Sequence, residues 1–300
     1  MSGTAKLAMG RNVFVVQEFR LGCAVWAYRG WLGDFYPRGS VAKDFLRLYG
    51  DRLHAVEGNT TFYAVPSAET VTRWREQTPP EFRFCLKFPQ AVTHQGPLMA
   101  QLDQAKAFID RVKPLGDRLG CIFAQLPPYY SPNYYDDLQA FLLALADYSV
   151  TLGVEVRHLD WFHAPHRIRL DTLLAHYSVS KVLLDTRPIY NCPDNPQAHS
   201  QRPKPEVPLI PTVTNQKAII RFISHPKRAF NQPYFEQWCQ QIQQWYAAGH
   251  SIYFFMHCPI EDHSPGHAHY FQEQLQQAQV PVPLLPWQKL APEPKQLKLF

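Results

Sequence analysis

The stretch His54-Ala-Val-Glu-Gly-Asn-Thr-Thr-Phe-Tyr63 decides both the fold and the place of the site. Its apolar start predicts a short strand over residues 54–60 that runs into a turn. Strand side chains alternate between two faces, so Glu57 and Asn59 are expected on the same face. An acid and an amide at the end of a strand need hydrogen-bond partners if they are buried. We therefore expect this strand end to contribute to a polar pocket.

Seven further apolar segments of strand length share this pattern, and most are separated from one another by helical segments. Strands buried on both faces are continuous apolar runs, which is typical of a parallel sheet. Eight such units in about 250 residues predict an α/β fold of the (β/α)8 TIM-barrel type. An open doubly wound sheet is the alternative, but no Gly-rich phosphate fingerprint follows the first strand. The predicted strands are residues 20–25, 54–60, 82–88, 119–126, 152–157, 181–185, 218–223 and 251–256.

The chain is predicted to form a single barrel domain over residues 19–285, preceded by an N-terminal extension over residues 1–18. Prolines are concentrated in residues 188–211, which predicts a long loop without a good helix after the sixth strand. Residues 286–300 contain further prolines and are predicted to form an extended tail.

Composition indicates a globular chain of 300 residues, of which 46% are hydrophobic and 18% charged. The formal net charge of +5 suits an anionic ligand, but no long Lys/Arg run indicates a nucleic-acid-binding arm. No apolar run approaches the roughly 18 residues of a membrane span. The six cysteines form no C-x-x-C pair and lie mostly in apolar segments, which favours buried free thiols in a reducing compartment. We therefore predict a cytoplasmic protein.

In a TIM barrel the site lies at the carboxyl ends of the strands. Seven of the eight predicted strands carry polar residues at or just beyond this end, including three acids, three bases, an imidazole and two amides. They are Glu57, Asn59, Lys87, Gln125, Glu155, Arg157, Asp185, Arg221 and His257.

An ordered set of motifs resembles a known family. Val56-Glu-Gly-Asn-Thr-Thr-Phe-Tyr63 is similar to its V-E-x-N-x-T-F-Y signature, and Gly22-Cys-Ala-Val-Trp26 with Phe35-Tyr-Pro37 resembles its start. Phe84-x-x-Lys87 with Thr93-His94, Gln125-Leu-Pro-Pro128, Val154-Glu-Val-Arg-His158 and Asp185 follow in the family's order. On these residues the chain is identified as a member of the DUF72 family, also called YecE-like.

This resemblance covers roughly residues 20–270. It implies a TIM barrel of unestablished biochemical function. Many members have an Asn-rich end to the last strand, whereas this chain has Met256-His-Cys-Pro259. The site positions that the resemblance implies are Glu57, Asn59, Lys87, His94, Gln125, Glu155, Arg157 and Asp185.

The polar ring has two interpretations, and the sequence leaves both open. In one, the acids and bases satisfy each other and plug the barrel top. In the other, Arg157, Arg221 and Lys87 bind a phosphate or carboxylate, with Asn59, Gln125 and His94 beside them. Catalysis would then fall to the acids and the imidazole, acting as acid, base or metal ligand. They are Glu57, Glu155, Asp185 and His257.

Two further features of the predicted rim remain open. A divalent metal could bind His and carboxylate ligands, for which His158 and His225 are additional candidates, but Lys87 and Arg157 would compete for the same acids. No tight ligand pair is present, so no residue is assigned to a metal. The aromatic loop that begins with Trp26 and Tyr28 is either a stacking platform for bases or sugars, or packing over the rim.

The chain ends in Gln296-Leu-Lys-Leu-Phe300, which resembles the Q-L-x-L-F pentapeptide by which bacterial repair and replication proteins dock on the sliding clamp. Leu297, Leu299 and Phe300 would enter an apolar groove while Gln296 forms a hydrogen bond at its rim. The alternatives are a tail that folds back on its own barrel, and coincidence.

Three functions are therefore compatible with the sequence. The first is a nuclease-like or hydrolase-like enzyme for a phosphate-containing or nucleic-acid substrate, brought to DNA by the tail. The second is a sugar or sugar-phosphate isomerase or hydrolase. The third is a non-catalytic adaptor barrel.

Overall fold

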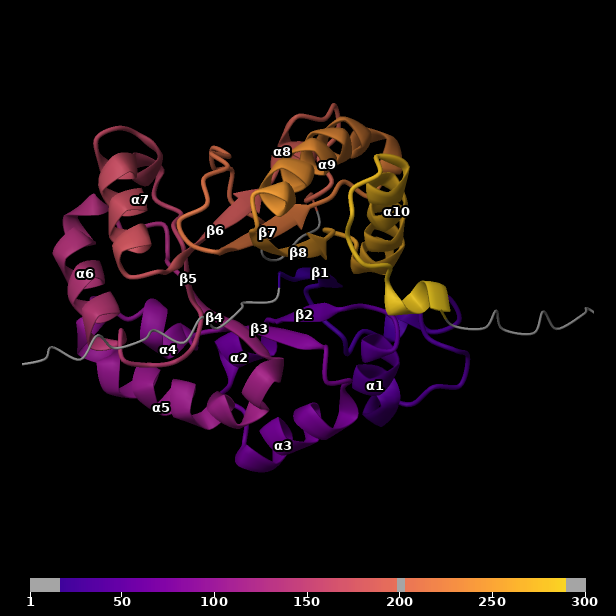
Figure 1. Ribbon diagram of the computed structural model, residues 1–300, viewed down its shortest axis with the longest axis horizontal. Helices are drawn as coiled ribbons and strands as arrows, with labels where there is room; N and C mark the ends of the chain where they lie inside the picture. Colours follow the sequence, from indigo (N-terminus) through magenta and orange to yellow (C-terminus); the bar gives the residue numbers. More distant parts are fainter. Residues whose placement is uncertain (1–16, 199–202, 290–300) are drawn as a thin grey trace, which may run out of the picture.

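The computed structural model describes residues 17–198 and 203–289 and confirms the predicted barrel. Eight parallel strands close in sequence order, with β8 pairing to β1. Helices surround the strands (Figure 1). The strands are β1 (Phe19–Cys23), β2 (Ala55–Gly58), β3 (Arg83–Lys87), β4 (Leu119–Gln125), β5 (Leu152–Glu155), β6 (Ser180–Asp185), β7 (Lys217–Ile223) and β8 (Ser251–His257).

Amphipathic helices form the outer layer, and each turns its apolar side to the strands. The longer ones are α1 (Phe45–Gly50), α3 (Ala68–Gln77), α5 (Leu102–Val112), α6 (Tyr135–Ala144), α7 (His166–His176), α9 (Gln232–Ala247) and α10 (Ser264–Gln277), and the one-turn helices are α2 (Thr60–Tyr63), α4 (Gln90–Thr93) and α8 (Arg187–Tyr190). Ser67 caps α3 by accepting a hydrogen bond from the Thr70 amide. Gly249 follows α9 with a φ of +88°, a conformation that glycine adopts without strain.

The connection between β6 and β7 differs from the other crossovers. Only the single turn α8 follows β6, and the described part of residues 191–216 contains no regular helix or strand. The Pro-rich loop is therefore confirmed, apart from this turn. Val207 anchors the loop by packing against Leu184 and Ile223.

An apolar layer covers each face of the cylinder of strands. The larger one lies between strands and helices, and the smaller one fills the barrel and consists of Ala55, Cys85, Cys121, Phe123, Val182, Ile219, Tyr253 and Phe255. Side chains two residues further along a strand point the same way. The residues that follow Ala55, Cys85 and Ile219 by two are polar, so the interior changes from apolar to charged toward the carboxyl end.

The fold bears on two sequence predictions, that of buried free cysteines and that of a chain without a membrane span. All six cysteines are free thiols, and all except Cys192 are buried. Among the described residues, no helix combines the length and apolar character that a membrane crossing requires.

Candidate active site

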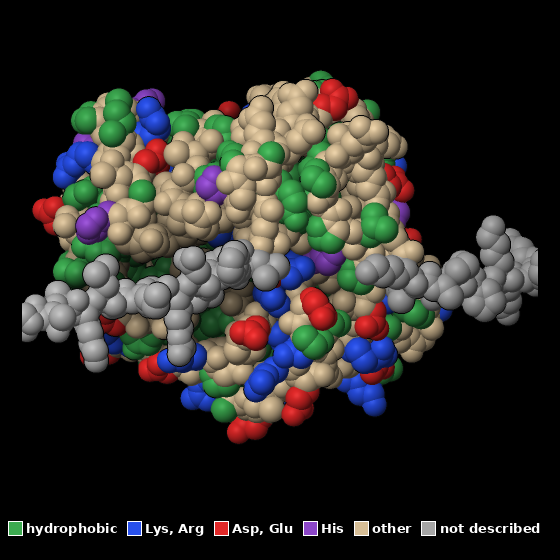
Figure 2. Space-filling view, viewed as in Figure 1, with side chains coloured by type: hydrophobic (Ala, Val, Ile, Leu, Met, Phe, Trp, Pro, Cys, Tyr) green, Lys and Arg blue, Asp and Glu red, His purple; other side chains and the backbone are tan. Residues whose placement is uncertain are grey.

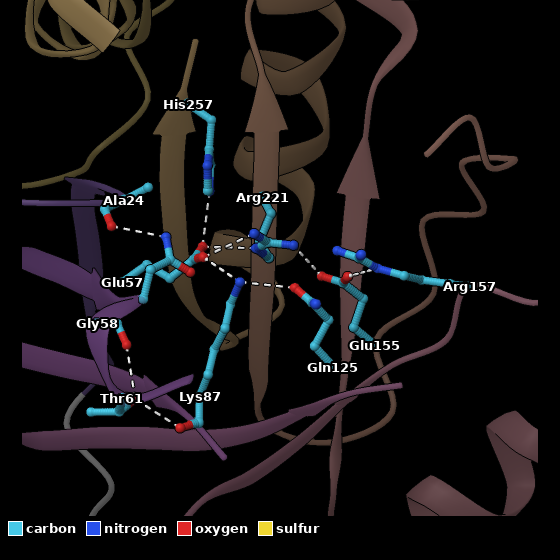
Figure 3. A network of polar contacts seen from close by, with 11 residues as sticks. Ala24, Glu57, Gly58, Thr61, Lys87, Gln125, Glu155, Arg157, Arg221 and His257 are labelled. Atoms are coloured by element: carbon cyan, nitrogen blue, oxygen red, sulfur yellow. Dashed lines mark hydrogen bonds and ion pairs between the residues drawn. The ribbon is translucent and has the colours of Figure 1, made fainter. Parts of the chain in front are cut away.

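Arg221 lies at the centre of the charged end of the barrel and is fully buried (Figure 3). Its Nε and Nη2 donate to the two oxygens of Glu57 at 2.8 and 2.9 Å. Its Nη1 donates to Glu155 Oε2 at 2.5 Å. One guanidinium from β7 thus holds two buried carboxylates, from β2 and β5, in fixed positions.

Glu57 has two further partners. His257 Nε2 lies 2.9 Å from Glu57 Oε2, and Lys87 Nζ lies 3.2 Å from Glu57 Oε1. The Lys87 ammonium also donates to Gln125 Oε1 at 2.8 Å. Glu57 therefore contacts three side chains, of Arg221, His257 and Lys87.

Burial and the neighbouring charges set the protonation states. Burial alone would raise the pKa of both acids, but Arg221 and the other bases hold the pKa of Glu155 at about 2 and that of Glu57 well below its ordinary value. Burial lowers the pKa of His257 to about 4 despite its contact with Glu57. Burial, followed by the charge of Arg221, lowers the pKa of Lys87 to about 7. At neutral pH the carboxylates are ionised and His257 is neutral.

A cavity of about 590 Å³ opens above this network. Three of its lining residues are bases: Lys87, Arg157 and Lys204. Among the described residues no carboxylate lines it, and Glu57 and Glu155 are fully buried beneath. Arg157 Nε donates to Glu155 Oε1 at 2.8 Å. The other lining residues are Val25, Asn59, Phe62, Tyr63, Gln90, His94, Gln125 and Pro203.

Lys204 was not predicted from the sequence. It belongs to the β6–β7 connection, where its carbonyl accepts a hydrogen bond from Tyr190 Oη and its amide donates to Gln197 Oε1. Burial, and then the positive charge of Arg221, lowers the pKa of Lys204 to about 8. The many prolines predicted only that this segment is a loop. No local sequence pattern indicated that a lysine of the loop lies at the barrel mouth.

Asn59 and His94 lie at the cavity as predicted. Asn59 Nδ2 donates to the Ala24 carbonyl at 2.9 Å, which ties the end of β2 to the loop after β1. His94 forms a 2.8 Å hydrogen bond to the Thr93 hydroxyl through Nδ1. Burial, followed by the charges of Arg157 and Lys87, lowers the pKa of His94. An uncharged imidazole thus faces the cavity at neutral pH.

Asp185 does not join this site, which corrects its predicted catalytic role. Its carboxylate accepts hydrogen bonds from Trp238 Nε1 at 2.8 Å and from Arg187 Nε and Nη2 at 2.9 and 2.8 Å. Val182 faces the barrel interior, so Asp185, three residues later, faces the helices. Asp185 attaches α8 and α9 to the strand wall.

The two aromatic residues predicted to bind ligand also have other contacts. Trp26 packs edge-on against Trp74 with ring centroids 5.4 Å apart, and Tyr28 Oη donates to Asp262 Oδ2 at 2.7 Å. Neither lines the cavity, so their arrangement agrees with packing over the rim. Phe62 and Tyr63 supply the aromatic wall instead.

The donor set at the barrel mouth does not suit a metal ion. Each oxygen of Glu57 and Glu155 already accepts from a base, so a cation would have to displace Arg221, Arg157 or Lys87. His158 is partly exposed, and its Nδ1 accepts a hydrogen bond from the Asp160 amide.

A second group of metal-ligand types, Cys192, Asp194 and His225, has its donor atoms within 4.8 Å of one another. His225 Nδ1 accepts the Lys227 amide at 2.9 Å, so Nε2 carries the proton and donates to Asp194. Lys227 Nζ lies 2.8 Å from the other oxygen of Asp194. Hydrogen bonds within the chain therefore satisfy these groups.

The buried network predicts a loss of stability in acid. His257 has a lower pKa when folded than when unfolded, so the unfolded chain binds more protons below about pH 6.5. From pH 6.5 to 4 this residue alone is expected to reduce the free energy of unfolding by about 3 kcal/mol. Glu57 and Glu155 extend the loss below pH 4.5 because their folded pKa values are also lowered. Urea unfolding at a series of pH values measures the effect.

His257→Gln is the matched variant, because a Gln amide can still donate to Glu57 but does not titrate. It should lose less stability than the wild type between pH 6.5 and 4. An identical loss in both proteins would show that His257 is not responsible.

Comparison with known protein families agrees with this fold. A family model described as "Protein of unknown function DUF72" matches residues 20–294. The UPF0759 protein YecE of Escherichia coli K12 is 34% identical over 258 residues, covering 85% of this chain and 92% of the relative. The UPF0759 protein YunF of Bacillus subtilis is 26% identical over 145 residues, covering 45% of this chain and 51% of the relative.

Two solved structures share the architecture. A DUF72 family protein from Enterococcus faecalis superimposes with a TM-score of 0.65 at 19% identity, covering 93% of this chain and 99% of that one. Another from Thermotoga maritima gives a TM-score of 0.60 at 21% identity, covering 86% of this chain and 99% of that one. At these identities the similarity establishes the fold alone.

Proposed function

The chain belongs to the DUF72 family of proteins of unknown function, and we propose that its barrel binds a phosphate-bearing ligand between Lys87, Arg157 and Lys204. The observation that carries this proposal is the separation of charge at the barrel mouth. The bases face the cavity, whereas the carboxylates lie beneath it, held by Arg221. An anion entering the cavity therefore meets positive charge first.

The charge balance supports the same ligand. Two carboxylates, Glu57 and Glu155, are matched by the guanidinium groups of Arg221 and Arg157. Lys204, together with the fraction of Lys87 that is protonated at neutral pH, then adds positive charge in excess of these two acids. A phosphate group, with about −1.5 to −2 charges at pH 7, would complete the balance.

Three of the eleven residues that line the cavity are Lys or Arg, and none of the eleven is Asp or Glu. On the face drawn in Figure 2, Lys and Arg side chains are interspersed with Asp and Glu. The cavity volume of about 590 Å³ suits a small molecule. Phe62 and Tyr63 offer aromatic surface to its organic part. These features favour a small phosphorylated compound, such as a sugar phosphate or a single nucleotide, over a long nucleic acid.

Recruitment to a sliding clamp stays a prediction from the sequence. Gln296, Leu297, Leu299 and Phe300 lie outside the residues that the structure describes. Binding to a sliding clamp would bring the protein to DNA and would not change the chemistry of the barrel mouth.

Calorimetric titration of the full chain with inorganic phosphate tests the proposal. Arg157→Met and Lys204→Met should each weaken phosphate binding about tenfold, corresponding to roughly 1.4 kcal/mol for a charged hydrogen bond. Lys43→Met is the matched control, because Lys43 is an exposed lysine that does not line the cavity. Equal affinities in the wild type and both cavity variants would contradict the proposed site.

A further inference from the structure

Lys87 combines deep burial with access to the cavity. It ends β3 and is 5% exposed, yet it lines the 590 Å³ space. The rings of Phe123 and Phe62 lie beside its amino group, with centroids 5.6 and 5.9 Å from Nζ, and Gln125 and Glu57 are its polar neighbours. A lysine in such a place is poorly solvated, which disfavours its charged form.

The ion pair with Glu57 does not fully counter this effect. Glu57 makes two hydrogen bonds to Arg221 and one to His257, and its contact with Lys87 is the longest of the set at 3.2 Å. Arg221 also repels the ammonium, and the pKa of Lys87 falls to about 7. The free amine is therefore present beside the ammonium form at neutral pH.

The neighbours divide the cavity into two parts. Arg157 and Lys204 are nearer the opening, with side chains partly exposed, whereas Lys87 is deeper. A phosphate bound by the outer pair would place the rest of a small ligand toward the amine. Buried amines of this kind are the nucleophiles of enzymes that form Schiff bases with carbonyl substrates.

We propose that Lys87 Nζ forms an imine with the aldehyde or ketone carbon of a phosphate-bearing ligand. This inference rests on the proposed phosphate site. The free amine attacks the carbonyl carbon, a C–N bond forms, and one amine proton moves to the oxygen to give a carbinolamine. The C–O bond then breaks and the hydroxyl leaves with the second amine proton as water. The net change is the replacement of C=O by C=N with the loss of one water molecule.

Reductive trapping tests the inference on the full-length wild-type chain. Glyceraldehyde 3-phosphate is added with sodium cyanoborohydride, which reduces the imine to a stable secondary amine. Peptide mass mapping should show Lys87 gaining the mass of the probe less one oxygen atom. Labelling at Lys87 should exceed labelling at the exposed Lys43 in the same digest at least tenfold. Added inorganic phosphate should reduce it.

One variant and a pH series separate the nucleophilic from the structural role of Lys87. Lys87→Arg keeps a positive charge beside Glu57 but has no nucleophilic amine, so it should remove the label. The labelling rate of the wild type should rise with a midpoint near pH 7, whereas an ordinary lysine would give a midpoint near pH 10. The charged and titratable groups around Lys87 in this series are Glu57, Glu155, Arg157, Arg221, Lys204, His94 and His257.

The outcomes distinguish the two proposals. If phosphate binds but Lys87 is labelled no more than Lys43, the imine chemistry is wrong and the phosphate site stands. If unphosphorylated glyceraldehyde labels Lys87 as strongly as its phosphate, the amine is reactive but the proposed phosphate site is wrong. A parallel trap with an oligonucleotide containing one abasic deoxyribose identifies the source of the carbonyl. Crosslinking to DNA alone would identify damaged DNA, and labelling by the sugar phosphate alone would identify a metabolite.

Discussion

Replacing Arg221 with Met is expected to lower the free energy of unfolding by about 3–5 kcal/mol, because it leaves Glu57 and Glu155 as buried charges without their main partner. Met has a similar length and adds no cavity of consequence, so the electrostatic loss dominates. Urea or guanidinium unfolding, monitored by tryptophan fluorescence, measures the change.

Two comparisons show whether the loss comes from the buried pair. Arg47→Met removes an exposed arginine that pairs with Asp51 on the surface, and its cost should stay below about 1 kcal/mol. Adding Glu57→Gln and Glu155→Gln to Arg221→Met should recover part of the lost stability, since no buried carboxylate is then left without its Arg221 partner. An Arg221→Met protein as stable as Arg47→Met would refute the description of the network.

Asp185→Ala is expected to cost about 2–4 kcal/mol of stability, because it removes the acceptor of the buried Trp238 indole and of the Arg187 guanidinium. Its effect on phosphate affinity should be negligible, since Asp185 faces the helices. Asp51→Ala, at an exposed ion pair, is the matched control and should be nearly neutral. A stable Asp185→Ala protein that fails to bind phosphate would restore the catalytic prediction and contradict the orientation described above.

Sequence reasoning predicted the barrel because each strand is a separate apolar run, and seven of the eight predicted strands have polar residues at their carboxyl ends. It also predicted the positions of Glu57, Lys87, Gln125, Glu155, Arg221 and His257. Each of these follows an interior residue by two, and the carboxyl ends of parallel strands meet at one mouth. The alternation of side chains along each strand was sufficient to predict where these residues lie.

The residues that sequence reasoning misplaced or missed have different causes. Asp185 was grouped with the site because it ends a strand, although it lies three residues after the interior Val182 and so faces the other side. Lys204 was missed because it belongs to a loop, and loop paths depend on long-range packing such as that of Val207 on Leu184 and Ile223. The pairing of Arg221 with both acids could not be predicted either, since it joins three strands far apart in the sequence.

The most direct test of the account is a crystal structure of the full chain with tungstate, a tetrahedral oxyanion of phosphate shape with a strong anomalous signal. The account predicts an anomalous peak in the cavity, with oxygens within about 3 Å of the side-chain nitrogens of Arg157 and Lys204. An empty cavity, with tungstate bound only at surface lysines of the same crystal, would contradict the claim that this barrel mouth is an anion-binding site.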